Sequence, residues 1–352
     1  MSFGVGLIGN RAHQMSYGPV LEGHEDCTIV AAAEHNAEKA KPLQERFGVA
    51  VSDDYDSVLE NSEVDIVSIA TDFYLKLPLI RKAVACGKHI LVDKPISRTV
   101  VEARGIHDVV QGSDIKLVLS YPIRYLAGVA WLIRSLKSGE YANLTSYTHH
   151  FVRQFKDSDL MQYVSYPTPL RVNGGGELMN LGSHAVDLAH HLFGLPKRVF
   201  AHMENAYWQE YEQFGTEDMT TLVLEYDNLA ATIVTGRNKI RGKEGPSVNA
   251  VDVTVQGYWM RADLDSAYLN GEKVELETPA LDVSESCVWE LIDCIQEDRP
   301  SVMGVTDGLG VAQITTAAYQ SAESGRFMEL PLVDENHPGI TPEEQVIEGY
   351  LD

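Results

Sequence analysis

The sequence predicts an α/β protein of two domains, in which a parallel sheet with helices on both faces precedes a second, largely antiparallel sheet. A chain of 352 residues exceeds what one hydrophobic core usually holds, so two domains are expected. Short apolar runs alternate with helix-like segments up to residue 120, which is typical of βαβ units. From residue 144 onward, longer runs of β-forming residues dominate, so the second sheet is expected there.

The first domain is expected at residues 1–121. The apolar run at 3–8 predicts its first strand, which ends at Gly9 and leads through a polar turn into a helix that ends near Glu22. The same alternation then continues along the chain. It predicts strands at 28–34, 65–71, 89–92 and 116–120, and helices at 37–47, 75–86 and 100–110.

The second domain is expected at residues 122–333. Residues 334–352 hold six acids and no Lys or Arg, which indicates an acidic C-terminal tail that is either mobile or packed on a neighbouring subunit. Within the second domain, the pattern predicts helices at 127–136, 182–192, 284–296 and 308–324, and strands at 146–152, 220–226, 230–235 and 251–256.

Charge and cysteine content exclude several classes of function. Asp and Glu number 51 against 28 Lys and Arg, which gives a net charge of −23, and the acids are scattered along the chain. Such a surface repels nucleic acid and anionic membranes. There is no Cys-x-x-Cys pair, no run of 18 apolar residues and no signal-peptide pattern at the N-terminus. A cytoplasmic protein with a small-molecule partner is therefore expected.

A glycine-bearing turn follows the first strand. The spacing Gly4-x-Gly6-x-x-Gly9 matches a dinucleotide-binding pattern, but this match lies inside the strand. The pattern binds a pyrophosphate only where it forms the turn before a helix. The relevant loop is therefore 9–14, which keeps only the first glycine. Its candidate cofactor-binding residues are Gly9, Asn10, Arg11 and Ala12.

Glu34 is the candidate for choosing between the two nicotinamide cofactors. It ends the second predicted strand, 25 positions after Gly9, close to the roughly 20 expected for the acid that hydrogen-bonds the adenosine ribose. A carboxylate at this position repels the 2′-phosphate of NADP. Arg11 would instead favour NADP if its guanidinium paired with the 2′-phosphate, although it could also pair with the pyrophosphate. The sequence therefore favours NAD and leaves NADP open.

Two further stretches resemble a known family. Residues 85–95 read Ala-Cys-Gly-Lys-His-Ile-Leu-Val-Asp-Lys-Pro, and residues 174–188 read Gly-Gly-Gly-Glu-Leu-Met-Asn-Leu-Gly-Ser-His-Ala-Val-Asp-Leu. Both are similar to motifs of the Gfo/Idh/MocA oxidoreductases, and residues 64–71 and 324–331 extend the resemblance over nearly the whole chain. That family implies an N-terminal Rossmann domain and a C-terminal α/β domain with a large, mainly antiparallel open sheet, often used for dimerisation. It also implies a sugar or inositol-like substrate, and a homodimer or homotetramer is expected.

The resemblance also assigns the chemistry. It places Lys94 beside the nicotinamide, hydrogen-bonded to the reacting hydroxyl, and makes His184 the acid/base. The residue types agree, because a hydride leaves readily only as the hydroxyl proton departs, and an imidazole titrates near neutral pH. An ammonium stabilises the developing alkoxide. Asn180 is a third catalytic candidate. Further candidates for binding the cofactor are Thr71, Asp72, Asp93 and Lys94. The candidate substrate ligands are Lys94, Tyr121, Arg124, Arg153, Arg171, Asn180 and His184.

The chain departs from the family's motifs at three positions. The family's acid in the second motif is Asn180 here, and an amide can orient an imidazole or a hydroxyl but cannot take a proton. Asp93 stands where the family has Glu, and Pro122 stands where it often has Asn. Separately, Arg153 and Arg171 flank the polar segment before the glycine run, so either can hold a carboxylate or phosphate of a substrate, or form ordinary surface ion pairs.

Several histidines outside the matched positions suggest a metal site. Adjacent histidines point in different directions on a strand or a helix, so they seldom share one ion. Hydride transfer to nicotinamide needs no metal, and none is expected. The residues concerned are His149, His150, His190 and His191, together with His184 and Asp187.

The expected function is NAD(P)-dependent transfer of a hydride between nicotinamide and a secondary hydroxyl or ketone of a sugar, a sugar derivative or an inositol-like polyol. Two alternatives stay open. Some relatives of the family use bound NAD to cleave glycosides without net oxidation. A non-catalytic regulator is favoured by the incomplete glycine loop and by Asn180, and opposed by the retention of Lys94 and His184. If His184 is not the base, Tyr163 and Tyr166 are the next candidates.

Overall fold

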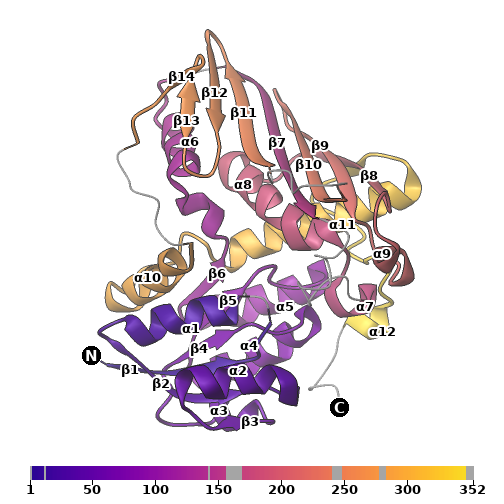
Figure 1. Cartoon of the computed structure of the whole chain (residues 1–352). Helices are drawn as coiled ribbons and strands as arrows, with labels where there is room; N and C mark the ends of the chain where they lie inside the picture. Colours follow the sequence, from indigo (N-terminus) through magenta and orange to yellow (C-terminus); the bar gives the residue numbers. More distant parts are fainter. Residues whose placement is uncertain are drawn as a thin grey trace.

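Two sheets with helices between them make up the fold of this computed structural model (Figure 1). The structure describes residues 2–11, 13–141, 143–155, 169–239, 248–276 and 283–345. The first sheet has six parallel strands and the second has nine strands with mainly antiparallel pairing. The predicted fold class is therefore confirmed.

The first sheet has the strand order β3-β2-β1-β4-β5-β6. In a sheet of this kind, ligands bind at the carboxyl ends of the strands, beside the point where the order reverses, here between β1 and β4. The strands are β1 (Phe3–Ile8), β2 (Cys27–Ala33), β3 (Val51–Ser52), β4 (Ile66–Ile69), β5 (His89–Asp93) and β6 (Leu117–Ser120), and the helices are α1 (Gln14–Gly23), α2 (Ala37–Phe47), α3 (Asp56–Leu59), α4 (Lys76–Ala85) and α5 (Val100–Gln111).

Local sequence signals explain where these elements lie. Asn36 caps α2 by accepting hydrogen bonds from the backbone N–H groups of Glu38 and Lys39, and Thr99 caps α5 in the same way. Gly4 lies within β1, where a Cβ atom would come within 1.7 Å of the Glu63 carbonyl oxygen. Gly4 and Gly6, the two glycines of the false dinucleotide pattern that lie inside β1, are therefore required by close packing.

Two helices from the C-terminal half return to the first sheet. Helix α10 (Val283–Gln296) packs on α1, β5 and β6, so it covers one face of the parallel sheet. Helix α11 (Val305–Ser324) packs on α5 on one side, and on strand β8 (Arg198–Glu204) and helix α8 (Ser183–Phe193) on the other. These contacts join the two sheets and bring the start of α8 toward the end of β5.

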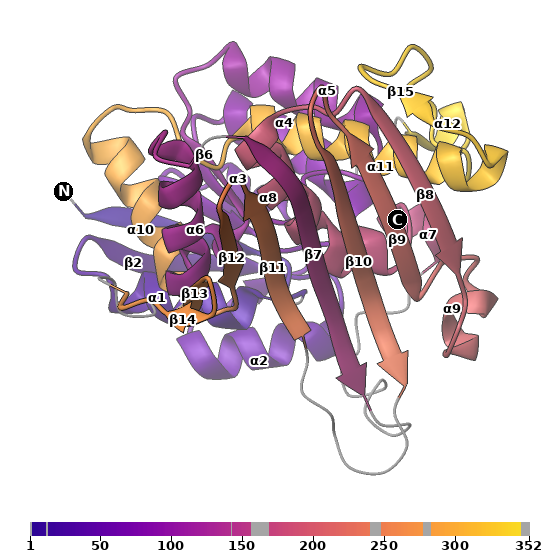
Figure 2. The same cartoon turned by 90° about the horizontal axis from the view of Figure 1, so that it is seen from above.

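The second sheet has the order β14-β13-β12-β11-β7-β10-β9-β8-β15, and β7 and β10 are its parallel pair. Helices α6 (Ala127–Lys137), α8 and α11 pack on its inner face. Figure 2 shows the opposite face, over which no helix of the described residues lies. The remaining strands are β7 (Leu144–Phe155), β9 (Met219–Glu225), β10 (Ala230–Lys239), β11 (Val248–Val255), β12 (Tyr258–Ala262), β13 (Ala267–Leu269), β14 (Glu272–Lys273) and β15 (Met328–Glu329).

Short elements were not predicted from the sequence. Most of them have five residues or fewer, which is too short for a clear hydrophobic period. They are the 3₁₀ turns η1 (Phe73–Leu75) and η2 (Pro122–Tyr125), the helices α7 (Leu170–Asn173), α9 (Gln209–Gln213) and α12 (Pro342–Gln345), and the strands β3 and β12 to β15. The seven-residue strand β8 was also not predicted. The turn η4 (Leu178–Gly182) is a π-helix that leads directly into α8. Such turns occur often at functional sites.

The described part of the acidic C-terminal segment packs on its own chain. His337 and Ile340 are buried, and the Gln320 side chain donates hydrogen bonds to the carbonyl groups of Asp334 and Asn336. Arg104 on α5 forms an ion pair with Glu335. Up to residue 345, the segment therefore packs on its own chain, where Ile340, His337 and the hydrogen bonds from Gln320 anchor it.

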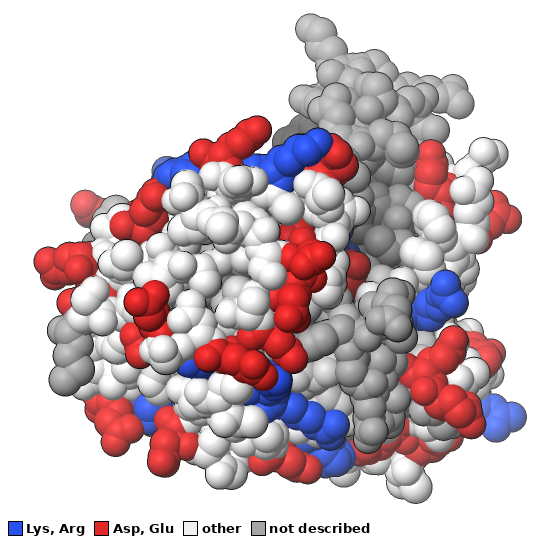
Figure 3. Space-filling model, turned by 90° about the horizontal axis from the view of Figure 1, so that it is seen from below, with Lys and Arg blue, Asp and Glu red and all other residues white. Residues whose placement is uncertain are grey.

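The acidic residues form several separate groups, with Lys and Arg side chains between some of them, on the face shown in Figure 3. This distribution agrees with the scattering of acids along the sequence. Among the described residues, no helix is long and apolar enough to span a membrane.

Candidate active site

Lys94 follows the last residue of β5 and is almost fully buried. A second buried lysine, Lys76 at the start of α4, holds the backbone on both sides of Lys94 by donating hydrogen bonds to the carbonyl groups of Asp93 and Pro95. Burial lowers the pKa of Lys76 to about 7, and a neutral amine still has two N–H groups for these two acceptors. No hydrophobic period in the sequence singled out Lys76.

Lys94 meets Asn180 from the second domain. Its Nζ lies 2.7 Å from the Asn180 backbone oxygen and 3.1 Å from Oδ1, and Asn180 sits in the π-helical turn η4. Burial lowers the pKa of Lys94 to about 8, with the Asp93 carboxylate raising it and the Arg11 guanidinium lowering it. Two of the three predicted catalytic residues are thus in direct contact.

His184 lies in the first turn of α8, one turn after Asn180. The edge of the Tyr121 ring packs against its imidazole, with ring centroids 5.6 Å apart, and Phe151 lies 6.2 Å away. Burial, and then the charge of Lys94, hold the pKa of His184 well below its usual value, so the imidazole is neutral at neutral pH. Its Nδ1 has no hydrogen-bond partner among the described residues. A neutral, buried imidazole beside an ammonium can accept a proton.

Glu177 is a site residue that the sequence interpretation missed. It is fully buried one turn before Asn180, and it accepts hydrogen bonds from Asn180 Nδ2 at 3.2 Å and from the hydroxyl of Tyr211. Arg237 Nε lies 2.8 Å from its Oε1. An acid between glycines and apolar residues was the available signal, because a charge in such a run is rarely solvated.

The glycine run before Glu177 is required by close packing. Gly175 has φ +152°, and a Cβ there would lie 1.8 Å from the hydroxyl oxygen of Tyr319. At Gly176 a Cβ would lie 1.9 Å from the Glu217 carbonyl oxygen. Only glycine therefore lets the chain pass this point and present Glu177 and Asn180 to Lys94.

The loop after β1 has the geometry of a nucleotide-binding turn. Gly9 has φ +77°, and a Cβ there would lie 2.5 Å from the Ala70 carbonyl oxygen and 2.6 Å from a methyl carbon of Thr71. The Glu34 carboxylate reaches this loop and accepts hydrogen bonds from the backbone N–H groups of Asn10, at 2.7 Å, and Asn36, at 2.8 Å. Ala12 lies outside the described residues.

Arg11 is buried, and its charge is already paired. Its Nε lies 2.9 Å from Asp72 Oδ1, and its guanidinium stacks over the Phe73 ring, 4.5 Å from the centroid. The two candidate cofactor residues Arg11 and Asp72 are therefore partners of each other. Glu34 differs from Arg11, because the two oxygens of its carboxylate accept hydrogen bonds from backbone N–H groups of the loop and of the start of α2.

Asp93 links the loop to Lys94. It accepts hydrogen bonds from the hydroxyl of Tyr17, at 3.1 Å, and from His13, whose Nδ1 lies 3.0 Å from Oδ1. Burial raises the pKa of Asp93, but His13 and the neighbouring lysines outweigh burial and hold it below its usual range. Asp93 thus carries a negative charge directly beneath the loop, and His13 is a second residue that the sequence did not single out.

Two expected substrate ligands are buried among other side chains. All five N–H groups of Arg124 are engaged, by Asp187, Asp307, His191 and the carbonyl group of Val302, so its expected contact with substrate stays a prediction that would require one of these partners to be displaced. Tyr121 has no exposed surface. We therefore place it behind His184, as packing for the imidazole.

The two other arginines differ. Arg153, exposed on β7, is close enough for its charge to lower the pKa values of both Lys94 and His184. Arg171 is exposed on α7, and its carbonyl group accepts a hydrogen bond from Arg98.

Tyr163 and Tyr166, the alternative bases, lie outside the described residues. Within those residues, no three His, Cys, Asp or Glu side chains gather as a metal ion would require.

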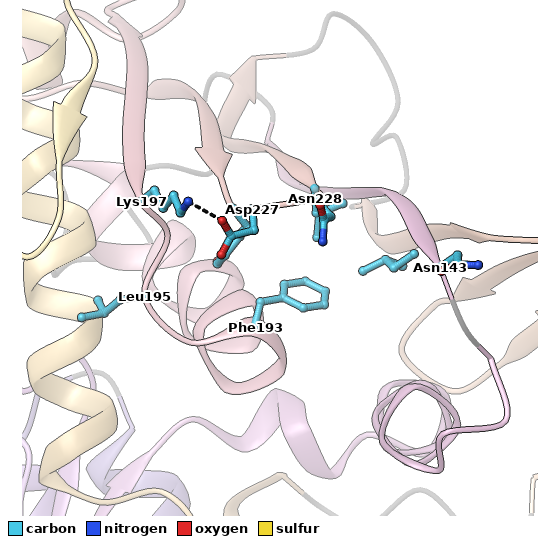
Figure 4. Close-up of a pocket in the computed structure, with 9 residues that line it drawn as sticks. Asn143, Phe193, Leu195, Lys197, Asp227 and Asn228 are labelled. Carbon is cyan, nitrogen blue, oxygen red and sulfur yellow. Dashed lines mark ion pairs between the residues drawn. The ribbon is translucent and has the colours of Figure 1, made fainter.

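A separate pocket of about 750 Å³ lies at the far end of α8 (Figure 4). An ion pair between Lys197 and Asp227 lies at its wall. None of the predicted site residues lines it. The labelled side chains around it are Asn143, Phe193, Leu195, Lys197, Asp227 and Asn228.

Family models match both halves of the chain. The model of an oxidoreductase family with an NAD-binding Rossmann fold, Gfo/Idh/MocA, matches residues 3–121, and the model of its C-terminal alpha/beta domain matches residues 168–330. The chain therefore belongs to the Gfo/Idh/MocA family of oxidoreductases, as the motifs indicated.

The individual relatives share about a quarter or less of their residues with this chain. Levoglucosan dehydrogenase of Pseudarthrobacter phenanthrenivorans is 27% identical over 199 residues, which cover 54% of this chain and 51% of the relative. Several curated relatives, like this one, are matched over only about half of their length. D-glucoside 3-dehydrogenase of Escherichia coli is 24% identical over 345 residues, which cover 93% of this chain and 96% of the relative. Levoglucosan dehydrogenase solved with NADH and L-sorbose has the same fold, with a TM-score of 0.80, 20% identity, and coverage of 95% of this chain and 100% of that one.

Proposed function

We propose that this chain is an NAD-dependent dehydrogenase that transfers a hydride between nicotinamide and a secondary hydroxyl or ketone of a sugar, a sugar derivative or an inositol-like polyol. The observation that carries the proposal is the contact of Lys94, from the parallel sheet, with Asn180, one turn before His184 in the second domain. The names of the relatives that act on levoglucosan, glucosides and scyllo-inositol support the substrate class.

The residues around the first βα turn fit a dinucleotide. The left-handed turn at Gly9 lets the backbone pass close to Ala70 and enter the loop after β1, where folds of this kind bind a pyrophosphate, and Glu34 offers a carboxylate to ribose hydroxyls. Asn10, Arg11, Thr71, Asp72, Asp93 and Lys94 complete the proposed cofactor site. A bound nicotinamide supplies the hydride acceptor or donor. Preference for NAD over NADP is supported by Glu34, since the Arg11 charge is paired with Asp72.

Three side chains divide the remaining chemistry. The Lys94 ammonium donates a hydrogen bond to the substrate oxygen and stabilises negative charge that develops there. His184, held neutral by burial, accepts the hydroxyl proton at its imidazole during oxidation and returns it during reduction. Asn180 cannot exchange a proton, so it orients Lys94. Arg153 supplies a positive charge near the site for an acidic substrate.

Assembly and location are proposed on separate grounds. The outer face of the nine-stranded sheet carries no helix of the described residues and offers a surface for a second copy, which supports a homodimer or homotetramer (Figure 2). All four cysteines are free thiols and three are buried, which supports a reducing, cytoplasmic location. Light scattering during gel filtration measures the number of subunits directly.

The activity is tested with a panel of sugars, sugar acids and inositols, each incubated with NAD and with NADP, while absorbance is followed at 340 nm, about where the reduced cofactor absorbs. Net formation of NADH with at least one polyol supports the proposal. Cleavage of a glycoside without net NADH would instead identify the redox-neutral reaction. A chain that binds NAD but turns over none of the panel would overturn the proposed function.

A further inference from the structure

Glu177 is a buried carboxylate at the centre of the site, and the proposed chemistry assigns it no part. It has no exposed surface, and its oxygens lie among three donors on three different elements: Asn180 in η4, Tyr211 in α9 and Arg237 in β10. A buried carboxylate is tolerated only with charged and hydrogen-bonded partners of this kind. The chain therefore maintains a costly group at this position, one helical turn from Lys94's partner.

The Asn180 amide lies between two groups with opposite requirements. Lys94 Nζ can only donate, so it requires the amide oxygen, which lies 3.1 Å away. The Glu177 carboxylate can only accept, so it requires the amide nitrogen, 3.2 Å from both of its oxygens. The two ends of an amide have almost the same shape, and packing alone does not distinguish its two orientations. Lys94 and Glu177 favour the same orientation, and Glu177 is the partner that holds the nitrogen end of the amide.

The orientation of the amide decides where the ammonium points. Of the three N–H groups on Lys94 Nζ, one is directed to the Asn180 backbone oxygen and one to Oδ1. The third is left for an oxygen of the substrate. In a flipped amide the NH₂ group would face the ammonium, Nζ would lose one acceptor, and its third N–H would have no fixed direction.

We propose that Glu177 is a positioning residue that acts through Asn180 to fix the direction of the Lys94 ammonium. The proposal rests on the proposed function for the role of Lys94 itself. It also accounts for the departure of this chain from the family motif: the carboxylate missing at position 180 is present one turn earlier, at position 177, and the neutral amide connects it to the lysine.

Two readouts test the proposal, and the first does not depend on activity. The rate at which acetic anhydride labels Lys94 is followed by peptide mass spectrometry from pH 6 to 11, a range of about two to three units on either side of the expected midpoint. The second readout is kcat, KM and the affinity for NADH. None of the variants below changes the other charged or titratable groups around Lys94. These are Asp93, Arg11, Arg153, Lys76 and His184.

Glu177→Gln removes the charge but keeps the shape. We expect the labelling midpoint of Lys94 to fall by about one pH unit, because the ammonium loses a fixed acceptor and a nearby negative charge. We expect kcat to fall about tenfold or more, with KM and NADH affinity within about threefold of wild type. Glu177→Asp keeps the charge opposite Arg237 but withdraws the carboxylate from Asn180, so it tests the same contact where Glu177→Gln does not fold.

A rescue and a matched control separate positioning from stability. The double variant Glu177→Gln/Asn180→Asp places a carboxylate next to Lys94, and we expect it to restore the midpoint and at least part of kcat. Glu217→Gln removes a buried carboxylate from the other side of the same turn, where Glu217 accepts hydrogen bonds from the backbone N–H groups of Gly176 and Leu178. It is expected to leave the Lys94 midpoint unchanged.

Three results would overturn the proposal. One is a Glu177→Gln protein with the wild-type midpoint and kcat. Another is an equal shift of the midpoint in Glu217→Gln, which would indicate a general loosening of the turn. The third is a double variant no better than Glu177→Gln alone. If the wild type oxidises no substrate, the proposed function is wrong, and the labelling midpoints still decide the role of Glu177.

Discussion

Raising the pH above about 8 is expected to suppress oxidation of the substrate, because Lys94 loses its proton there. Burial lowers the pKa of Lys94 to about 8, with Asp93 raising it and Arg11 lowering it. The ammonium fraction is then about nine-tenths at pH 7, about one-tenth at pH 9 and about one-hundredth at pH 10. If only the ammonium stabilises the alkoxide, kcat/KM falls about tenfold for each pH unit above 8.

The decline of kcat/KM at low pH has a different origin, which is the protonation of His184. The pKa of His184 is held well below its usual value of 6.5 by burial and by the charge of Lys94. Its imidazole therefore remains a competent base through neutral pH, and activity declines only well below pH 6.5. Oxidation is thus expected to be greatest between this lower limit and about pH 8.

The assay is the pH dependence of kcat/KM for substrate oxidation at saturating NAD. Asp93→Asn provides the internal test, since loss of the carboxylate that raises the pKa of Lys94 should move the alkaline limit about one unit lower. A kcat/KM that keeps rising from pH 8 to pH 10 would contradict the reasoning. An alkaline limit that Asp93→Asn leaves in place would assign it to a group other than Lys94.

Four further predictions follow from other residues. His184→Ala should lower kcat by ~10² to 10⁴ and remove the acid limb, and a normal kcat would mean that another group is the base. Glu34→Ala should reduce or reverse the preference for NAD in binding titrations with both cofactors; a wild type that binds NADP at least about tenfold tighter would exclude the ribose role. Arg153→Met should raise KM for an acidic sugar more than for a neutral one, while the matched Arg171→Met should affect both alike. Burial raises the pKa of Glu217 to about 7, so its contribution to stability is full below about pH 4.5 and is lost as pH rises through 7; Glu217→Gln should remove this dependence, on the order of 3 kcal/mol, from unfolding curves at pH 5 and pH 8.

The candidate site could be predicted only in part, for reasons that differ between residues. Lys94, Asn180 and His184 lie in contiguous motifs, and the structure brings the first two into contact. Glu177 was overlooked because nothing local in the sequence shows that Tyr211 and Arg237, which lie far away in the chain, would hold its carboxylate buried beside Asn180. The buried ion pairs of Arg124 were not foreseen, because nothing local in the sequence shows that Asp187, His191 and Asp307 would surround it.

The sequence by itself determined the two-sheet fold, the family and the position of the turn at Gly9, because hydrophobic period, glycine placement and contiguous motifs are local properties of the chain. Only the tertiary structure decided which charges are paired. The contacts of Arg11 with Asp72, of Lys76 with the carbonyl groups beside Lys94, and of Glu177 with Arg237 all depend on which segments share a buried space. The physical reason is that the protonation and orientation of a buried group depend on neighbours contributed by distant segments, and these are fixed only when the two sheets pack together.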